Sequence, residues 1–232
     1  MKYGIILDEE ISSEMGVSII TRPSIPTPLR QYNETEVKGK NGKLYEDLGT
    51  YEDIDIVVKC NFASKELDEW NDIYRKVKNW IKDKQKLRFA DDLSYFYATN
   101  KIEIDSPERV IKRIGRFNLK ISCKPFMNLE SGLEEMQIAS NIYNDYEEAR
   151  PTYKILGEGL LTLTINGVGI TANIGQNLTI NTEKGLCYRI DGTPNNIALT
   201  GDYKDLYLKE GNNTFTWSNG FTITVVPNWR CL

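Results

Sequence analysis

The 232-residue sequence contains no histidine. Catalytic triads, Cys–His dyads and ordinary histidine acid–base catalysis are therefore excluded, and an enzyme built from this chain would depend on carboxylates, lysine or tyrosine. Cysteine is also scarce, and no C-x-x-C pair occurs that could begin a zinc site. The sequence therefore indicates no metal and no cofactor. We expect buried free thiols at all four cysteines, Cys60, Cys123, Cys187 and Cys231.

Long apolar runs are missing as well. No stretch approaches the roughly 18 residues that a membrane-crossing helix needs, so we expect no membrane insertion. The N-terminus, MKYGIILDEE, has one lysine and a very short apolar stretch before three acids, which is not the pattern of a signal peptide. We therefore expect synthesis in the cytoplasm. The net charge of -4 and the pI near 5.2 argue against broad binding to nucleic acid, which requires clustered lysine and arginine.

The first half of the chain combines strands with one helix. Residues 53–60, DIDIVVKC, alternate apolar and polar side chains and predict a strand with one buried face. Residues 64–84 place apolar side chains three and four positions apart, with Ser64 as N-cap, which predicts an amphipathic helix. We therefore expect an α+β domain, residues 1–128, in which this helix lies on a β-sheet. Further strands are predicted at 86–91, 95–105 and 116–123.

The second half of the chain has a different pattern. After an acid-rich connector, placed at residues 129–136, short alternating stretches are separated by glycine-containing turns at intervals of roughly 8–12 residues, as in a sandwich or barrel. We predict an all-β domain over residues 137–232, and a mainly β fold class for the whole chain. Three dipeptides suit the type I′ turn, which needs positive φ at both central residues: Asn166-Gly167, Asp191-Gly192 and Asn219-Gly220.

The stretch EVKGKNGK, residues 36–43, raises the question of a phosphate-binding loop. Leu44 follows Gly42-Lys43 where the P-loop motif has Ser or Thr, and Val37 stands where the motif has its first glycine. The following residues are typical of a strand, so no helix N-terminus would face a phosphate. Asn41-Gly42 resembles the turn dipeptides of the second half, and we interpret the stretch as a hairpin tip.

Two other kinds of site are suggested only weakly. Adjacent carboxylates could belong to a hydrolase, but neighbours on a strand point to opposite faces, and a hydrolase would need acids that converge in a cleft. Trp217 and Trp229 could form a sugar-stacking platform, although aromatic residues at alternating strand positions more often belong to the core. The carboxylate pairs, which we interpret as turn and connector residues, are Asp91-Asp92, Glu134-Glu135 and Glu147-Glu148.

The order of motifs along the chain resembles that of the distal tail proteins of long, non-contractile-tailed phages and related prophages. The most specific motif is the terminal PNWRCL, residues 227–232, after a G-x-N turn. The chain departs from the family pattern at the hairpin tip and at Asn181, Tyr203-Lys204 and Glu210, mostly with turn chemistry preserved. The other matching features are Arg22-Pro23, the tip at 39–42, Ile54 and Ile56, the helix around Trp70, 87–92, Gly115 to Phe126, Pro151-Thr152-Tyr153, 163–167, Tyr188, Gly201-Asp202-Tyr203 and Gly211-Asn212-Asn213.

The resemblance implies a structural, non-enzymatic protein of the virion tail tip. Members of the family look like hubs, in which six copies join through the N-terminal domain into a ring whose channel continues the tail tube. DNA would pass through this ring without specific binding, and the C-terminal galectin-like sandwich would point outward. The implied partners are the tail tube protein, a lysin-type tail-tip protein, and receptor-binding or baseplate proteins that serve host attachment.

The hairpin tip is the candidate subunit interface of such a ring. An alternative function, from another class, is a carbohydrate-binding module that contacts host cell-wall glycan through aromatic side chains of the second domain. Family members that bind sugar often carry an extra inserted domain, and 232 residues leave no room for one. The candidate interface residues are Gly39, Lys40, Asn41, Gly42 and Lys43.

Overall fold

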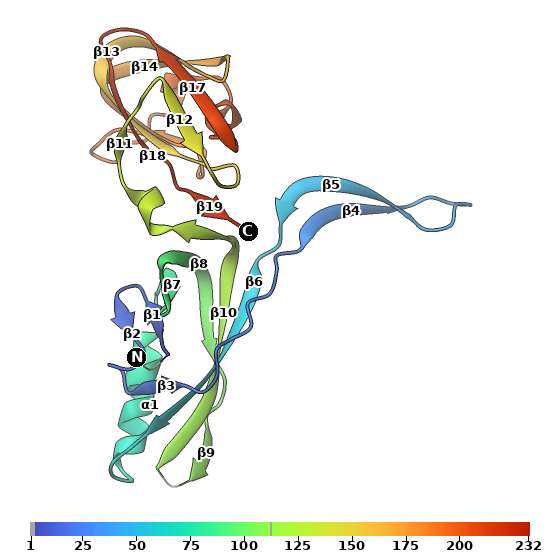
Figure 1. Cartoon of the computed structure of the whole chain (residues 1–232), viewed down its shortest axis with the longest axis vertical. Coiled ribbons are helices and arrows are strands. Elements are labelled where there is room, and N and C mark those ends of the chain that lie inside the picture. Colours follow the sequence, from blue (N-terminus) through green and yellow to red (C-terminus); the bar gives the residue numbers. More distant parts are fainter. Residues whose placement is uncertain (1–2, 112) are drawn as a thin grey trace. The chain divides into compact units, whose positions relative to one another are not determined.

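The computed structural model describes residues 3–111 and 113–232. The chain divides into two compact units, Met1–Met127 with Leu232 and Asn128–Cys231, which we call unit 1 and unit 2. Strands dominate both units (Figure 1), and one α-helix lies in unit 1 among the described residues. The predicted mainly β fold class is confirmed.

The main sheet of unit 1 has the strand order β2-β1-β7-β8-β10-β6-β3, and β9 pairs with β10 beside this path. Some neighbours, such as β7 and β8, are joined by a short turn, whereas β1 meets β7, and β6 meets both β3 and β10, across long stretches of chain. The strands are β1 (Ile5–Leu7), β2 (Glu10–Ile11), β3 (Val17–Ile19), β6 (Ile54–Ala63), β7 (Lys86–Phe89), β8 (Asp92–Ile104), β9 (Glu108–Ile111) and β10 (Ile114–Leu129).

The pairing of β6 with β10 forms the centre of the unit 1 core. Their antiparallel register runs from Ile54 opposite Cys123 to Ala63 opposite Ile114. Along β6, alternate side chains from Ile54 to Phe62 are buried, because successive residues of a strand point to opposite faces. The strand predicted from residues 53–60 is confirmed, with its apolar face turned to the core.

The helix is shorter than its pattern predicts. Helix α1 spans Glu69–Trp80 instead of 64–84, and its N-cap is Asp68, whose side chain makes no capping hydrogen bond. The predicted N-cap Ser64 is wrong, because its hydroxyl donates to the Arg113 carbonyl at 3.3 Å. The Glu69 carboxylate accepts hydrogen bonds from the amides of residues 65 and 66, so these amides are satisfied without a further helical turn. The face of α1 that is buried carries Trp70, Val77 and Trp80.

A separate two-stranded sheet interrupts unit 1 between β3 and β6. It consists of β4 (Arg30–Glu36) and β5 (Lys43–Tyr51), drawn as the long blue hairpin in Figure 1, and we call it the arm. The two strands pair only with each other in the described structure. Nearly every arm residue is exposed to solvent.

Unit 2 is all-β, as predicted, and its described residues form only short 3-10 turns besides strands. Its longest element is the hairpin of β13 and β14, whose register runs from Thr152 opposite Asn181 to Ile165 opposite Val168. β17 and β18 both add to β13. The strands are β11 (Met136–Gln137), β12 (Asn141–Asn144), β13 (Thr152–Ile165), β14 (Val168–Asn181), β15 (Leu186–Tyr188), β16 (Leu199–Thr200), β17 (Gly211–Trp217), β18 (Thr222–Val226) and β19 (Arg230–Cys231).

The predicted type I′ turns are only partly correct. Asn166 and Gly167 both have positive φ, 51° and 84°, and join β13 to β14 as expected. In Asp191-Gly192 and Asn219-Gly220 only the glycine has positive φ, so these are not type I′ turns. The same holds for Asn41-Gly42 in the arm. A dipeptide marks a turn in each case, but the neighbouring strands decide its type.

Candidate assembly site

The arm tip contains all five residues of the candidate interface. Glu36 lies opposite Lys43 in the register, and residues 37–42 connect the two strands. Gly39 and Gly42 have φ of 83° and 81°, conformations that glycine adopts without the strain of a side chain. The interpretation of EVKGKNGK as a hairpin tip followed by a strand is confirmed, and this geometry offers no helix N-terminus to a phosphate.

The arm is held together by contacts at its surface. Lys43 donates to the Glu34 carboxylate at 2.6 Å, and this hydrogen bond raises the pKa of Lys43. Arg30 pairs with Asp47 at 2.9 Å nearer the base. Exposed pairs of this kind contribute little to stability, since water screens the charges. A two-stranded hairpin without a buried face is marginally stable by itself, so these surface contacts give the arm little stability of its own.

Apolar side chains on both faces of the arm are exposed in the described part of the chain. The rings of Tyr32 and Tyr45 meet edge to face at 6.1 Å, yet Tyr45 is 62% exposed. Leu44 and Leu48 share the opposite face and are 49% and 53% exposed. The sequence predicts only the tip as an interface. It does not indicate these four residues, which we call the arm shaft, because an alternating pattern does not tell which strands pack against a second sheet.

The adjacent carboxylates do not converge on a common site. Asp91 forms an ion pair with Arg22 at 3.1 Å in the tight turn before β8. Glu135 contacts Lys154 and Thr224, and these two hydrogen bonds lower the pKa of its carboxyl. In residues 3–111 and 113–232, no group of three or more Cys, Asp or Glu residues is arranged to hold a metal ion.

The cysteine thiols are placed in the core rather than in a site. Cys60, Cys123 and Cys187 are buried free thiols and Cys231 is half-buried, so the predicted burial holds fully for three of the four. Burial raises the pKa of Cys60 and of Cys123 to about 12. A thiol with such a pKa carries almost no thiolate at neutral pH and is a poor nucleophile.

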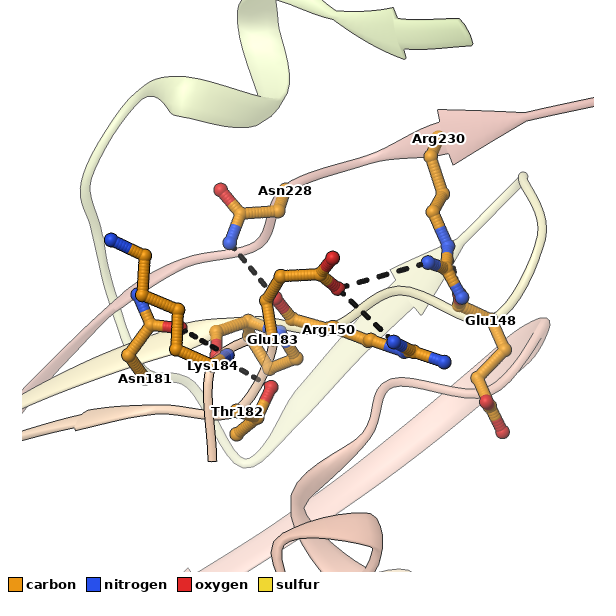
Figure 2. Close-up of polar contacts among 9 residues, drawn as sticks. Glu148, Arg150, Asn181, Thr182, Glu183, Lys184, Asn228 and Arg230 are labelled. Carbon is orange, nitrogen blue, oxygen red and sulfur yellow. Dashed lines mark hydrogen bonds and ion pairs between the residues drawn. The ribbon is translucent and has the colours of Figure 1, made fainter. Parts of the chain in front are cut away.

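The terminal PNWRCL motif lies in a polar cluster of unit 2 (Figure 2). Arg230 is only 9% exposed, and its Nε donates to the Glu148 carbonyl at 2.6 Å. Arg150 pairs with Glu183 at 3.4 Å, and Arg230 approaches the same carboxylate at 4.0 Å. Asn228, with φ of 55°, donates to the Arg150 carbonyl at 2.8 Å. These contacts fasten the end of the chain to the segment before β13 and to the turn after β14, which explains the motif structurally.

The two tryptophans considered for sugar binding are partly buried. Trp217 and Trp229 both pack against the apolar core of unit 2. Trp229 also faces Tyr146, with ring centroids 6.5 Å apart. Their arrangement gives each ring a packing role.

No helix in the described residues is long and apolar enough to cross a membrane.

Comparisons with known proteins agree on one group. Residues 11–123 match the model of the phage tail protein RIFT-related domain. The whole chain is similar in structure to the Dit (gp 19.1) protein of phage SPP1, described as a paradigm of the hub adsorption apparatus in phages that infect Gram-positive bacteria. The TM-score is 0.68, the identity 12%, and 100% of each chain is covered. The search of curated proteins found no match.

Two structures of the phage P2 baseplate in its activated conformation are also similar. The calcium form has a TM-score of 0.48 and 13% identity, covering 100% of this chain and 98% of that chain. The strontium form has a TM-score of 0.48 and 14% identity, covering 96% and 97%.

Proposed function

The chain carries a phage tail domain and has the fold of a distal tail protein, so the resemblance found in the sequence is confirmed, and from this premise we propose that it is the hub of a tail tip. In this proposal six copies form a ring that joins the tail tube to the tail-tip and receptor-binding apparatus. The role is structural and non-enzymatic. The protein is made in the host cytoplasm and ends in the virion at the tail tip.

The observation that carries the proposal is the arm. Its strands have no partner sheet in the described chain, and four of its apolar side chains are about half exposed or more: Tyr32, Leu44, Tyr45 and Leu48. A neighbouring copy would bury these side chains, and burial of a large apolar side chain contributes about 1.5–3 kcal/mol. When the arm of one copy meets a different surface of the next, the contact is head to tail, and such contacts form a ring when the rotation between copies closes.

Other surfaces support the proposed partners. The outer face of the β6–β10 pair is polar, with a Lys120–Asp55 ion pair of 2.9 Å, which suits a surface in contact with water or with DNA in transit. The tail tube protein and a lysin-type tail-tip protein would meet opposite faces of the ring. In unit 2, Ile197 is 96% and Ile190 72% exposed, and these side chains could seat a receptor-binding or baseplate protein.

The test is the oligomeric state of the purified protein and of an arm variant. We expect light scattering and negative-stain imaging to find a ring of six. Leu44→Glu combined with Leu48→Glu should leave monomers, because two buried carboxylates without partners would oppose the contact.

Leu160→Glu is the matched control for the arm variant. Leu160 lies in β13 of unit 2 and is 67% exposed, so this change adds a carboxylate without touching the arm. The control should assemble like the parent protein. An arm variant that still forms the same ring, or a control that falls apart equally, would contradict the role of the arm.

A further inference from the structure

The chain contains three Asn-Gly pairs, and they differ in chemical reactivity. Asparagine is thermolabile because the backbone nitrogen of the next residue can attack its side-chain carbonyl carbon. A new C–N bond forms, the side-chain nitrogen leaves as ammonia, and water then opens the succinimide ring to aspartate or isoaspartate. Glycine in the following position leaves this nitrogen open to the reaction, because it has no Cβ.

Asn166-Gly167 is held in an unreactive geometry. The Asn166 side-chain nitrogen donates to the Asn213 side chain at 2.9 Å, and its side-chain oxygen accepts from the Thr214 amide at 2.9 Å. Both turn residues are fixed by the flanking pair of Ile165 and Val168. The side chain must break both hydrogen bonds before its carbonyl carbon can rotate toward the Gly167 nitrogen.

Asn219-Gly220 is restrained by backbone contacts with the neighbouring strand. A Cβ on the neighbouring Gly157 would meet the Gly220 carbonyl oxygen at 2.8 Å, so the two backbones lie close together. The preceding Ser218 also accepts a hydrogen bond from the Thr162 amide through its hydroxyl at 3.1 Å. This turn has less freedom to reach the ring-closing conformation than an open loop.

Asn41-Gly42 has none of these restraints. The residues of the tip are exposed, and within the described part of the chain no side-chain hydrogen bond of Asn41 is found. The space around a Cβ at Gly42 is open, as it also is at Gly167 and Gly220, so the three pairs differ in their hydrogen bonds and backbone contacts instead. The loop of residues 37–42 is also longer than the two-residue turn of Asn166, so its backbone can rotate more easily.

We propose that Asn41 is a site of spontaneous deamidation in the unassembled protein. The product carries a new carboxylate among the three lysines of the tip, Lys38, Lys40 and Lys43, and so lowers the positive charge there. If the tip contacts a neighbouring copy, as the proposed function has it, assembly protects Asn41 and deamidation marks chains that stayed unassembled. This consequence rests on the proposed function, whereas the modification itself does not.

Peptide mapping by mass spectrometry of the monomeric fraction, aged at neutral and mildly alkaline pH, tests the modification. Because Asn166 must first break two hydrogen bonds, we expect Asn41 to react at least about tenfold faster, with Asn219 between them. Asn41→Ser should abolish the fast reaction and leave the other two sites unchanged. The proposal is overturned if Asn41 is not the fastest of the three.

Assembly is measured separately, by comparing Asn41→Asp with Asn41→Ser in light scattering. A weaker ring for Asn41→Asp alone supports the protective role of assembly. If Asn41 deamidates in monomers and Asn41→Asp assembles as well as Asn41→Ser, the modification stands and the consequence for assembly fails. An Asn41 that keeps its amide overturns the modification whatever the assembly result.

Discussion

The arm and the β13–β14 hairpin are two long hairpins of one chain that differ in their surroundings. Both alternate along their strands, and both have an Asn-Gly pair in the connection. The β13–β14 hairpin pairs further with β15, β16, β17 and β18, and its inner face is part of the unit 2 core. Among the residues that the structure describes, β4 and β5 of the arm pair only with each other. Neighbouring strands therefore stabilise the β13–β14 hairpin, whereas the arm is held only by its own two strands.

The difference has an energetic meaning. Residues fixed in a strand lose conformational entropy worth about 1–2 kcal/mol each, and apolar burial must offset that loss. In β13, Leu161, Leu163 and Ile165 are fully buried or nearly so. The arm buries almost nothing, so its order in solution should depend on whether a partner is present.

The largest difference between the two hairpins should appear when one leucine of each is replaced with alanine. Leu161 in β13 is 0% exposed, and Leu161→Ala should lower the free energy of unfolding of unit 2 by roughly 2–5 kcal/mol, because a cavity is left in the core. Leu44→Ala in the arm should change the stability of the monomer by less than about 0.5 kcal/mol. Hydrogen exchange of the β13 and β5 amides at increasing urea concentration measures the loss of stability in each hairpin separately. Equal losses would contradict the comparison.

The next effect compares a buried with an exposed charge. Arg230→Ala should destabilise unit 2 by roughly 1.5–3 kcal/mol, since the Glu148 carbonyl and the Glu183 carboxylate lose a charged partner. Lys43→Ala breaks only the exposed contact with Glu34 and should leave unfolding unchanged. Thermal unfolding of both variants checks this. If Arg230→Ala is as stable as the parent protein, the polar cluster has no structural role.

Much of this architecture follows from the sequence. Two features do not, the start of α1 and the exposure of the arm, and each has a physical reason. The period of two at 53–60 and the period of three to four around Trp70 identified β6 and α1, because burial of one face leaves a pattern. The helix start was wrong because Glu69 satisfies nearby amides by its side chain. The arm shaft was missed as part of the candidate site, since its alternation resembles that of a buried strand and its lack of a partner depends on tertiary structure.

A moderate effect on assembly is expected from the tip. Replacing Asn41-Gly42 with Ala-Ala puts a side chain at Gly42, whose φ is 81°, and costs about 1–2 kcal/mol unless the tip changes shape. The reshaped tip should weaken the ring while unit 2 stays folded. Replacing Asn166-Gly167 with Ala-Ala is the control and should destabilise unit 2 without altering the arm. An unchanged hexamer of the tip variant in light scattering would refute the role of the tip.

The smallest effect concerns pH. The Glu135 carboxyl contacts Lys154 and Thr224, which hold its pKa below its usual range, so its contribution exists above the unfolded pKa and is lost as pH falls through the folded pKa. When the pH is lowered, unit 2 of the parent protein should therefore lose at most about 1 kcal/mol of stability through Glu135, because the pair is exposed. Glu135→Gln should not show this loss. Urea unfolding between neutral pH and about pH 3 measures it. An identical pH slope in both proteins would contradict this. In the arm the sign is opposite, since Glu34 raises the pKa of Lys43, so that contact weakens only as pH rises through the raised pKa.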